Sequence, residues 1–370
     1  MLKQYRVRNY DFKLIILVSA LTVIGIFAVG SAEESYQKTQ MAGFIFGLFL
    51  MVVISLFDYS VLLKLYWFFY IANVVLLLLV ETPLGKVVNG AKRWIILFGM
   101  QFQPSETAKI LLILFYAQFI MKHKDKLNTF KYITLCCLFV LPPVILIFRQ
   151  PNLSTTIVMM VIFCVIMFVG GISWKLVTGV LAVFVPVVVI VFSIVIQPEQ
   201  QLIRGYQQTR ILAWLYPEKY ATTEAYQQLN SIMAIGSGQL YGKGYKTNVI
   251  SSVKNGNFIS EPQTDFIFAV IGEEFGFIGS CAVIVLVILI TLECIHIARK
   301  AKDLAGTIIA AGMAGLIGFQ GFLNIGVTTG VLPNTGVTLP FVSYGLTSLL
   351  SLYIGVGFVL NVGLQGKKYY

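Results

Sequence analysis

Residues 260–279 read SEPQTDFIFAVIGEEFGFIG, and residues 280–298 continue as SCAVIVLVILITLECIHIA. The second stretch is nearly all apolar and close to the roughly 20 residues that cross the hydrocarbon core of a bilayer. The chain has only 16 acidic residues. Four of them lie in the first stretch: Glu261, Asp265, Glu273 and Glu274. The two stretches together predict a membrane-spanning helix with carboxylates gathered at its mouth.

The composition extends this interpretation to the whole chain. Of its 370 residues, 58% are hydrophobic and only 12% are charged, which is too apolar for soluble domains of this length. We therefore predict an all-α polytopic membrane protein with about ten transmembrane helices in one domain, residues 1–370. The predicted spans are roughly 12–32, 41–57, 61–80, 105–121, 132–148, 154–171, 176–196, 273–297, 305–325 and 346–364.

Ten spans place both ends of the chain on the same side of the membrane. The start of the chain carries KQYRVR, and the loops expected on that side carry KHKDKLNTFK (122–131) and ARKAKD (298–303). Because basic loops face the cytoplasm, we predict a cytoplasmic membrane protein with both termini in the cytoplasm. These loops also account for the net charge of +11, so nucleic acid is not an expected partner.

The opposite side is predicted to hold a large extracytoplasmic loop, residues 197–264, and two shorter segments, 81–106 and 330–345. The segment 81–106 is basic and includes Arg93 and Trp94. Positive charge outside runs against the orientation rule, so it suggests an anionic ligand. Trp94 is either an ordinary interface anchor or part of that ligand site.

One charged pair lies at the outer end of a predicted span, in QPSETAKI (103–110). Glu106 and Lys109 are three residues apart, so they share one helical face. They either satisfy each other as a simple ion pair or form the wall of a polar pocket, since charged residues within a membrane usually face a cavity or a partner.

Two motifs occur in the large loop. GYQQTRILAWLYPEKY (205–220) predicts an amphipathic helix lying on the membrane, with Arg210 on a face away from lipid. AIGSGQLYGKGY (234–245) is rich in glycine, but it lacks the spacing and the strand–helix frame of a phosphate-binding P-loop. Its glycines predict tight turns, and Lys243 is a candidate anion contact.

Asp265 precedes an apolar run and is expected at the outer rim of a helix. Its carboxylate is either stabilised by the helix dipole or acts as a general base, because a partly desolvated carboxylate gains basicity and can accept a proton from a sugar hydroxyl. Glu273 and Glu274 lie deeper, and at least one should line a cavity or pair with a cation. The cysteines lie in apolar runs and both histidines beside basic clusters, so no metal site is expected.

Six motifs in order over nearly the whole chain resemble the SEDS family (shape, elongation, division and sporulation). They are GAKRWI…QPSETAKI, QPNLSTT, YQQTRIL, AIGSGQLYGKG, TDFIFAVIGEEFGFIG and NIGVTTGVLPNTGVTLPFVSYGLTSLL. The resemblance implies a ten-helix SEDS fold and a peptidoglycan glycosyltransferase that polymerises lipid II on the outer face of the cytoplasmic membrane. The implied partners are a class B penicillin-binding protein and other proteins of the elongation or division complex.

The resemblance also implies roles for particular residues. The family's essential acid matches Asp265, and its RW and PSExxK positions match Arg93, Trp94, Glu106 and Lys109. In the implied inverting reaction, Asp265 is the base that activates the acceptor hydroxyl. The cations that can neutralise the leaving diphosphate are Lys109, Arg93, Arg210 and Lys243. These residues do not define a cofactor. A divalent cation, Mg²⁺ or Mn²⁺, remains an open alternative as a further positive charge at the diphosphate.

The chain departs from the family pattern at a few positions, none of them in the Asp265 motif: Asn152, Ser154, Gln239 and Leu346. GYQQTRIL and GKGY favour the elongation (RodA-like) branch, with the division (FtsW-like) branch as the alternative. The rival function is a flippase or transporter of the lipid-linked precursor. The sequence of a transporter is expected to carry charged residues in the middle of its membrane spans, whereas the charged residues here concentrate at the outer ends of the spans.

Overall fold

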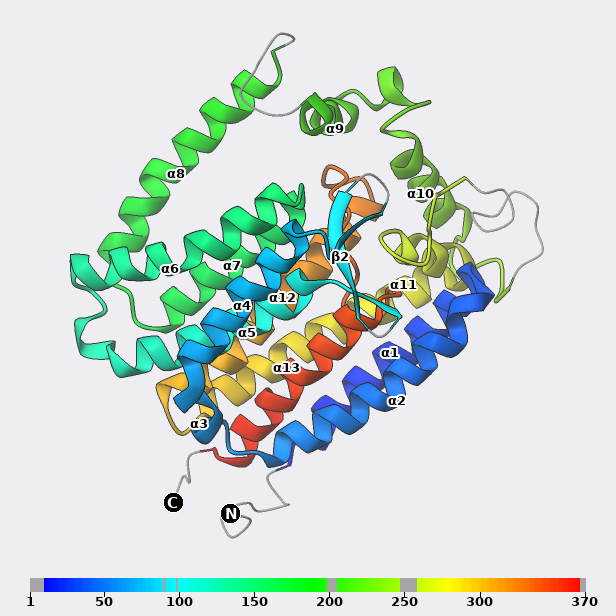
Figure 1. The fold of residues 1–370 in the computed structure, drawn as a ribbon. Coiled ribbons are helices and arrows are strands. Elements are labelled where there is room, and N and C mark those ends of the chain that lie inside the picture. The colour runs from blue at the N-terminus through cyan, green and yellow to red at the C-terminus, as the bar shows by residue number, and fades with distance from the viewer. Residues whose placement is uncertain (1–9, 89–90, 98, 198–204, 247–257, 367–370) are drawn as a thin grey trace.

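The computed structural model describes residues 10–88, 91–97, 99–197, 205–246 and 258–366. Within these residues the chain folds into a bundle of long helices (Figure 1), and each of the ten predicted spans falls on one of them. The long helices are α1 (Phe12–Ala32), α2 (Glu34–Leu56), α4 (Tyr66–Glu81), α5 (Pro104–Lys122), α6 (Phe130–Arg149), α7 (Leu153–Val169), α8 (Trp174–Val195), α11 (Ile267–Lys300), α12 (Leu304–Thr328) and α13 (Leu346–Leu364). Short helical turns at the loops are α3 (Tyr59–Leu62), η3 (Leu63–Leu65) and η4 (Lys124–Lys126).

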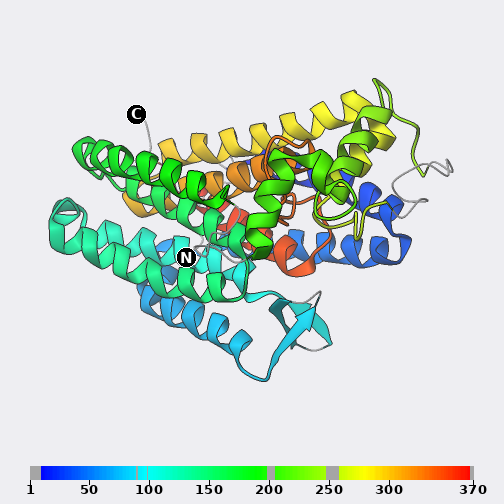
Figure 2. The same cartoon turned by 90° about the horizontal axis from the view of Figure 1, so that it is seen from above.

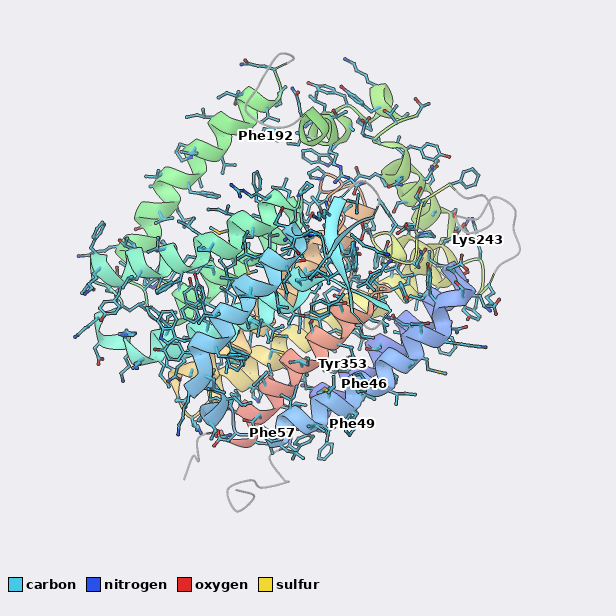
Figure 3. All side chains as sticks on the ribbon, in the orientation of Figure 1. Phe46, Phe49, Phe57, Phe192, Lys243 and Tyr353 are labelled. Atoms are coloured by element: carbon cyan, nitrogen blue, oxygen red, sulfur yellow. The ribbon has the colours of Figure 1, made fainter. Side chains whose placement is uncertain are left out.

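The prediction of a polytopic membrane protein is confirmed. Among the described residues, eight helical stretches are long and apolar enough to cross a membrane. The other two members of the bundle are α5, which carries Glu106 and Lys109 near its start, and α7, which is shorter. Large apolar side chains such as Phe46 and Phe49 point outward from α2, as expected of a surface that meets lipid (Figure 3).

Two predicted helix starts were wrong. The second span begins at Glu34, not at 41, and the eighth begins at Ile267, not at 273. In α2, polar residues at the outer end continue the helix beyond its apolar part, so hydropathy alone places the boundary too late. In α11, the added residues 267–272 are apolar, and the predicted boundary is too late because it treats Glu273 and Glu274 as the outer edge of the span.

Both ends of the described chain lie at the same end of the bundle. The Oη of Tyr10, just before α1, is 2.8 Å from the Oγ of Ser55 at the end of α2. The amide of Asn361, near the end of α13, donates to the carbonyl of the same Ser55 at 2.7 Å. This is the arrangement that an even number of crossings requires.

The opposite end holds elements that do not cross the bundle. A three-stranded antiparallel sheet joins α4 to α5, in the order β1 (Gly85–Val88), β2 (Ala91–Leu97) and β3 (Met100–Phe102). Figure 2 shows this sheet projecting from the end of α4. The bundle itself is all-helical, as predicted, and the small sheet was not predicted from the sequence.

The large loop between α8 and α11 contributes two further helices, α9 (Gly205–Leu215) and α10 (Tyr226–Ser237). The helix predicted at 205–220 is thus confirmed as far as Leu215, after which a 3₁₀ turn follows, η5 (Pro217–Tyr220). Pro217 cannot donate the next helical hydrogen bond, which explains the end of α9. The parts of the predicted loop at 198–204 and 247–257 lie outside the described residues.

The core of the bundle is centred on α12. Glycines along it meet side chains of three neighbours at close range: Gly312 meets Ile113 of α5, Gly315 meets Val165 of α7, and Gly321 meets Val287 of α11. Small residues allow such close helix contacts inside membranes. By contrast, α8 is exposed over almost its whole length and is set apart from the bundle in Figure 1.

The long helix α11 is interrupted near its outer end. Gly276 has φ +64° and ψ −158°, a conformation that breaks the helix and that essentially only glycine adopts. In a regular helix the amides of Phe277 and Ile278 would donate to the carbonyls of Glu273 and Glu274.

A loop segment, residues 239–244, replaces those interrupted bonds, and we call it the loop clamp. The amides of Phe277 and Ile278 donate to its carbonyls at Gln239 (2.8 Å) and Leu240 (3.3 Å). In return its amides donate to the carbonyls of Glu273 and Glu274, from Lys243 (2.9 Å) and Gly244 (3.1 Å). These four backbone groups are therefore paired, and the predicted tight turns occur here at Gly242 and Gly244, both with positive φ.

Candidate active site

Three successive carbonyls fix the backbone that carries Asp265. The carbonyl of Gln263 accepts from the amide of Tyr344 at 2.9 Å. The carbonyl of Thr264 accepts from the Oγ of Ser343 at 2.6 Å. The carbonyl of Asp265 itself accepts from the Nδ2 of Asn324 at 2.7 Å. The turn before α11 is therefore held against both α12 and the segment 330–345.

The side chain of Asp265 lies at a partly exposed position. Among the described residues, no hydrogen bond to its carboxylate oxygens is found, and the residue keeps partial solvent exposure although protein surrounds it densely. Gly336, with φ +69°, passes so close that a methyl group added there would lie 3.1 Å from Oδ2. Glycine at this position leaves the space beside the carboxylate open.

Charged groups near Asp265 come from its own turn, which holds Glu261, and from two other segments, which hold Arg93 and Arg210. Burial raises the pKa of the Asp265 carboxyl to about 6. The positive charge of Arg93 opposes this increase, the negative charge of Glu261 adds to it, and the positive charge of Arg210 opposes it. A carboxyl with such a pKa is mostly ionised at neutral pH and is a stronger base than an ordinary aspartate.

Arg93 and Arg210 reach the site from different elements. Arg93, on β2, donates from Nε to the carbonyl of Gln150 at 3.1 Å and from Nη2 to the carbonyl of Pro151, which holds the sheet to the α6–α7 turn. Arg210 is exposed on α9. Trp214 anchors α9 by donating from Nε1 to the carbonyl of Gly330 at 3.0 Å.

Trp94, the other predicted residue of the RW pair, is half-buried on β2 opposite Lys86. The contacts found among the described residues do not join it to Asp265. Its predicted role in substrate binding therefore stays a prediction.

Glu106 and Lys109 form a buried polar network inside the bundle. The Nζ of Lys109 donates to Oε1 of Glu106 at 2.9 Å and to Oε1 of Gln320 at 2.8 Å. Ser348 on α13 donates to Oε2 of Glu106 at 2.7 Å. Only 2% of Lys109 is exposed, so its ammonium is engaged by protein groups, and its predicted contact with a diphosphate stays a prediction.

Lys243 lies in the loop clamp, where its Nζ is 2.7 Å from Oε1 of Glu273. Glu274 accepts a hydrogen bond from Ser31 of α1. One of the two deep glutamates thus pairs with a cation, as expected. Figure 3 shows Lys243 at the end of the molecule far from Phe57, which marks the end where α2 finishes.

The Glu106–Lys109 network and the backbone of Asp265 are both hydrogen-bonded to α12. Gln320 binds Lys109, and Asn324, one turn further along the same face, binds the backbone of Asp265. Gln320, Asn324 and Ser343 were not among the predicted site residues. Two amide side chains spaced by four residues in an apolar helix were the available signal, because polar residues within membrane helices usually face a functional interior.

The departures from the family pattern have local roles. Asn152 caps α7 by accepting from the amide of Thr155 at 3.2 Å, and Ser154 donates to the carbonyl of Thr335. Ser154 thereby holds the residue that precedes Gly336, whose backbone passes beside Oδ2 of Asp265. Gln239, with φ +48°, begins the loop clamp.

The family model described as "cell cycle protein", which covers FtsW, RodA and SpoVE, matches residues 5–368. The chain belongs to this FtsW/RodA/SpoVE family. Among relatives, it is 32% identical to a probable peptidoglycan glycosyltransferase FtsW of Geobacter sp. (strain M18), over 97% of this chain and 98% of that protein. It is also 32% identical to the peptidoglycan glycosyltransferase MrdB of Escherichia coli (strain K12), over 97% and 95% of the two chains.

Solved structures of the FtsW/RodA/SpoVE family share the fold. A chain of a peptidoglycan synthase complex, described for its coordination of polymerization and crosslinking, matches with a TM-score of 0.78 and 29% identity over 96% of this chain and 97% of that chain. The rod shape determining protein RodA of Thermus thermophilus matches with a TM-score of 0.69 and 29% identity over 96% of both chains. The resemblance seen in the sequence motifs is thus confirmed.

Proposed function

We propose that this chain is a peptidoglycan glycosyltransferase that polymerises lipid II, with Asp265 as the general base. The observation that carries the proposal is the Asp265 carboxylate, fixed through its backbone, left without a protein hydrogen bond among the described residues, and within the field of two arginines. The relatives named as peptidoglycan glycosyltransferases support it.

The chemistry requires one base and one site of positive charge. The 4-hydroxyl oxygen of the acceptor GlcNAc forms a bond to C1 of the donor MurNAc, and its proton passes to Asp265. The bond from C1 to the diphosphate breaks, and the diphosphate leaves with the electron pair. Because attack and departure occur on opposite faces of C1, the configuration inverts, which needs a base on one face and charge stabilisation on the other.

Arg93 and Arg210 suit the leaving group best. Both are close enough to Asp265 to influence its pKa, and arginine binds phosphate oxygens through several donors at once. The positive charges of Lys243 and Lys109 are balanced by the carboxylates of Glu273 and Glu106, respectively. Arg93 instead donates to the uncharged backbone carbonyls of Gln150 and Pro151. We therefore assign the two lysines to holding the site rather than to the diphosphate.

A resident divalent cation finds little support in the chain's own side chains. Within the described residues, no group of three or more His, Cys, Asp or Glu side chains is placed to hold a metal. Mg²⁺ or Mn²⁺ would instead arrive with the diphosphate, where it would add positive charge. The residues assigned above do not depend on it.

We also propose the orientation and the partner. The end that carries Asp265, α9 and the sheet faces the outside of the cytoplasmic membrane, and the termini face the cytoplasm, as the basic loops indicate. The match to a chain of a peptidoglycan synthase complex supports a crosslinking partner of the class B penicillin-binding type. The equal identities to FtsW and MrdB relatives do not separate the branches, and the motifs favour the elongation branch.

A specific measurement tests the function. Purified full-length chain in lipid nanodiscs, given lipid II already accessible from the outer face, should produce glycan strands, and Asp265→Asn should not. A flippase would move lipid II between leaflets and leave it unpolymerised, so transport without product would overturn the proposal.

A further inference from the structure

Asn324 is almost fully buried in the middle of the outer part of α12, with 1% of its surface exposed. Its single amide nitrogen donates two hydrogen bonds, to the carbonyl of Asp265 at 2.7 Å and to the carbonyl of Val337 at 2.6 Å. These carbonyls belong to segments that are 72 residues apart in the chain (265 to 337). One side chain thus joins the acid to the segment 330–345.

The second bond matters for the acid as much as the first. Val337 follows Gly336, whose backbone forms the wall beside Oδ2 of Asp265. The same amide therefore fixes the backbone that carries the carboxylate and the backbone that passes next to it. Since the carboxylate oxygens have no hydrogen bond of their own among the described residues, their position depends on these backbone anchors.

Asparagine at position 324 is well suited to donate both of these hydrogen bonds. One primary amide nitrogen supplies two N–H donors from one atom, which the hydroxyl of Ser or Thr cannot do. Leucine has nearly the same size and shape but no donor. Aspartate would place an acceptor oxygen against two carbonyl oxygens.

We propose that Asn324 is a positioning residue for catalysis, which holds the Asp265 carboxylate in line with the acceptor hydroxyl by joining the backbones of Asp265 and Val337. The inference rests on the proposed function. Ser343, which donates to the carbonyl of Thr264 at 2.6 Å, supports the same backbone from the other side. A misplacement of about 1 Å can cost roughly 10²-fold in rate.

The chain offers a matched control at the other end of the bundle. Asn361 on α13 is also fully buried, and its amide donates to the carbonyl of Ser55 at 2.7 Å while its Oδ1 accepts from the amide of Tyr59 at 2.9 Å. Its removal should weaken the fold without touching the surroundings of Asp265.

The first readout is kinetic. Full-length wild type, Asn324→Leu, Asn324→Ala and Asn361→Ala are compared in lipid II polymerisation at equal amounts of folded protein. We expect both Asn324 variants to lose about 10²-fold in kcat with KM within about threefold of wild type, and Asn361→Ala to keep its kcat. Ser343→Ala should lower kcat by a smaller factor. This variant takes the place of the Asn324 variants in the test if those do not fold. A kcat within threefold of wild type in these variants would overturn the proposal.

The second readout needs no activity. Asp265→Asn should raise the unfolding temperature above pH 6 in the wild-type background, because it removes the cost of ionising a buried carboxyl. In the Asn324→Leu background that gain should shrink, since a loosened carboxylate can hydrate. An equal gain in both backgrounds would contradict the positioning role. If wild type makes no polymer, the proposed function fails, and this second comparison still decides the role of Asn324.

Discussion

Lys109 and Asp265 are anchored to the same face of α12, one helical turn apart. Lys109 donates to Gln320, and the backbone of Asp265 accepts from Asn324. Four residues along a helix correspond to about 6 Å. The buried ion pair in the bundle and the partly exposed Asp265 at the end of the bundle are thus parts of one arrangement, although α5 and the turn before α11 are far apart in sequence.

Asp265→Asn should remove activity and increase stability. Losing a general base costs about 10²–10⁴ in rate. The pKa of the folded carboxyl is raised to about 6, so its ionisation destabilises the fold progressively as pH rises from about 4 to 6 and fully above that. At pH 7 the neutral amide should therefore raise the free energy of unfolding by about 1–3 kcal/mol.

Thermal unfolding and lipid II polymerisation measured on the same preparation test this pairing. Asp125→Asn is the matched control, because Asp125 is exposed in η4, so it should change neither quantity. An Asp265→Asn protein that is inactive and also less stable than wild type would show that the carboxylate is structural.

The pH profile of kcat/KM should have an acid limb near pH 6. Only the ionised Asp265 accepts the proton, so the rate falls as pH drops through its pKa. Arg210 lowers that pKa and Glu261 raises it. Arg210→Gln should therefore move the limb to higher pH, whereas Glu261→Gln should move it to lower pH. If both variants shifted the acid limb in the same direction, a group other than Asp265 would be responsible for that limb.

Lys109→Met should destabilise the protein strongly. It leaves the buried carboxylate of Glu106 without its cation, and breaking a buried pair in this way costs about 3–5 kcal/mol. The double variant Glu106→Gln with Lys109→Met removes both charges and should recover much of the loss. Lys64→Met, at an exposed lysine of η3, is the control. Chemical unfolding in detergent measures all four proteins, and no recovery in the double variant would argue against a pair.

Gly276→Ala should disrupt the outer part of α11. The added methyl group would lie 2.4 Å from the amide nitrogen of Gly242 and would meet an unfavourable φ of +64°. Strain of this kind costs about 1–3 kcal/mol before the steric clash is added. Gly179→Ala in α8 is the matched control, because an added methyl group there has nothing within 4 Å. Equal melting temperatures of the two variants would rule out a strained break.

The sequence could predict the bundle because a long apolar run that crosses a bilayer satisfies its backbone hydrogen bonds by forming a helix. The exceptions have physical reasons. Hydropathy does not indicate that the polar residues after Glu34 continue α2. The start of α11 at Ile267 was missed because the prediction treats Glu273 and Glu274 as the end of the span, although residues 267–272 before them are apolar. The small sheet was missed because its strands are short and lie between two strong helical signals.

The candidate site was predictable only in part. Asp265 and the arginines stand out as charges at the edge of apolar runs. Asn324 and Ser343 do not, because their role depends on carbonyls of distant segments. The sequence suggested Lys109 as a ligand contact, and only coordinates reveal that Gln320 and Glu106 already engage its ammonium.

The loop clamp has a consequence for how the protein is built. Residues 239–244 precede Gly276 in the chain, so they leave the ribosome before the helix they complete. The turns of α11 outside the break share their hydrogen-bond ladder with this loop, and they cannot close as an ordinary helix on their own. The loop must therefore dock before the outer part of α11 is complete, so these two segments form as one folding unit.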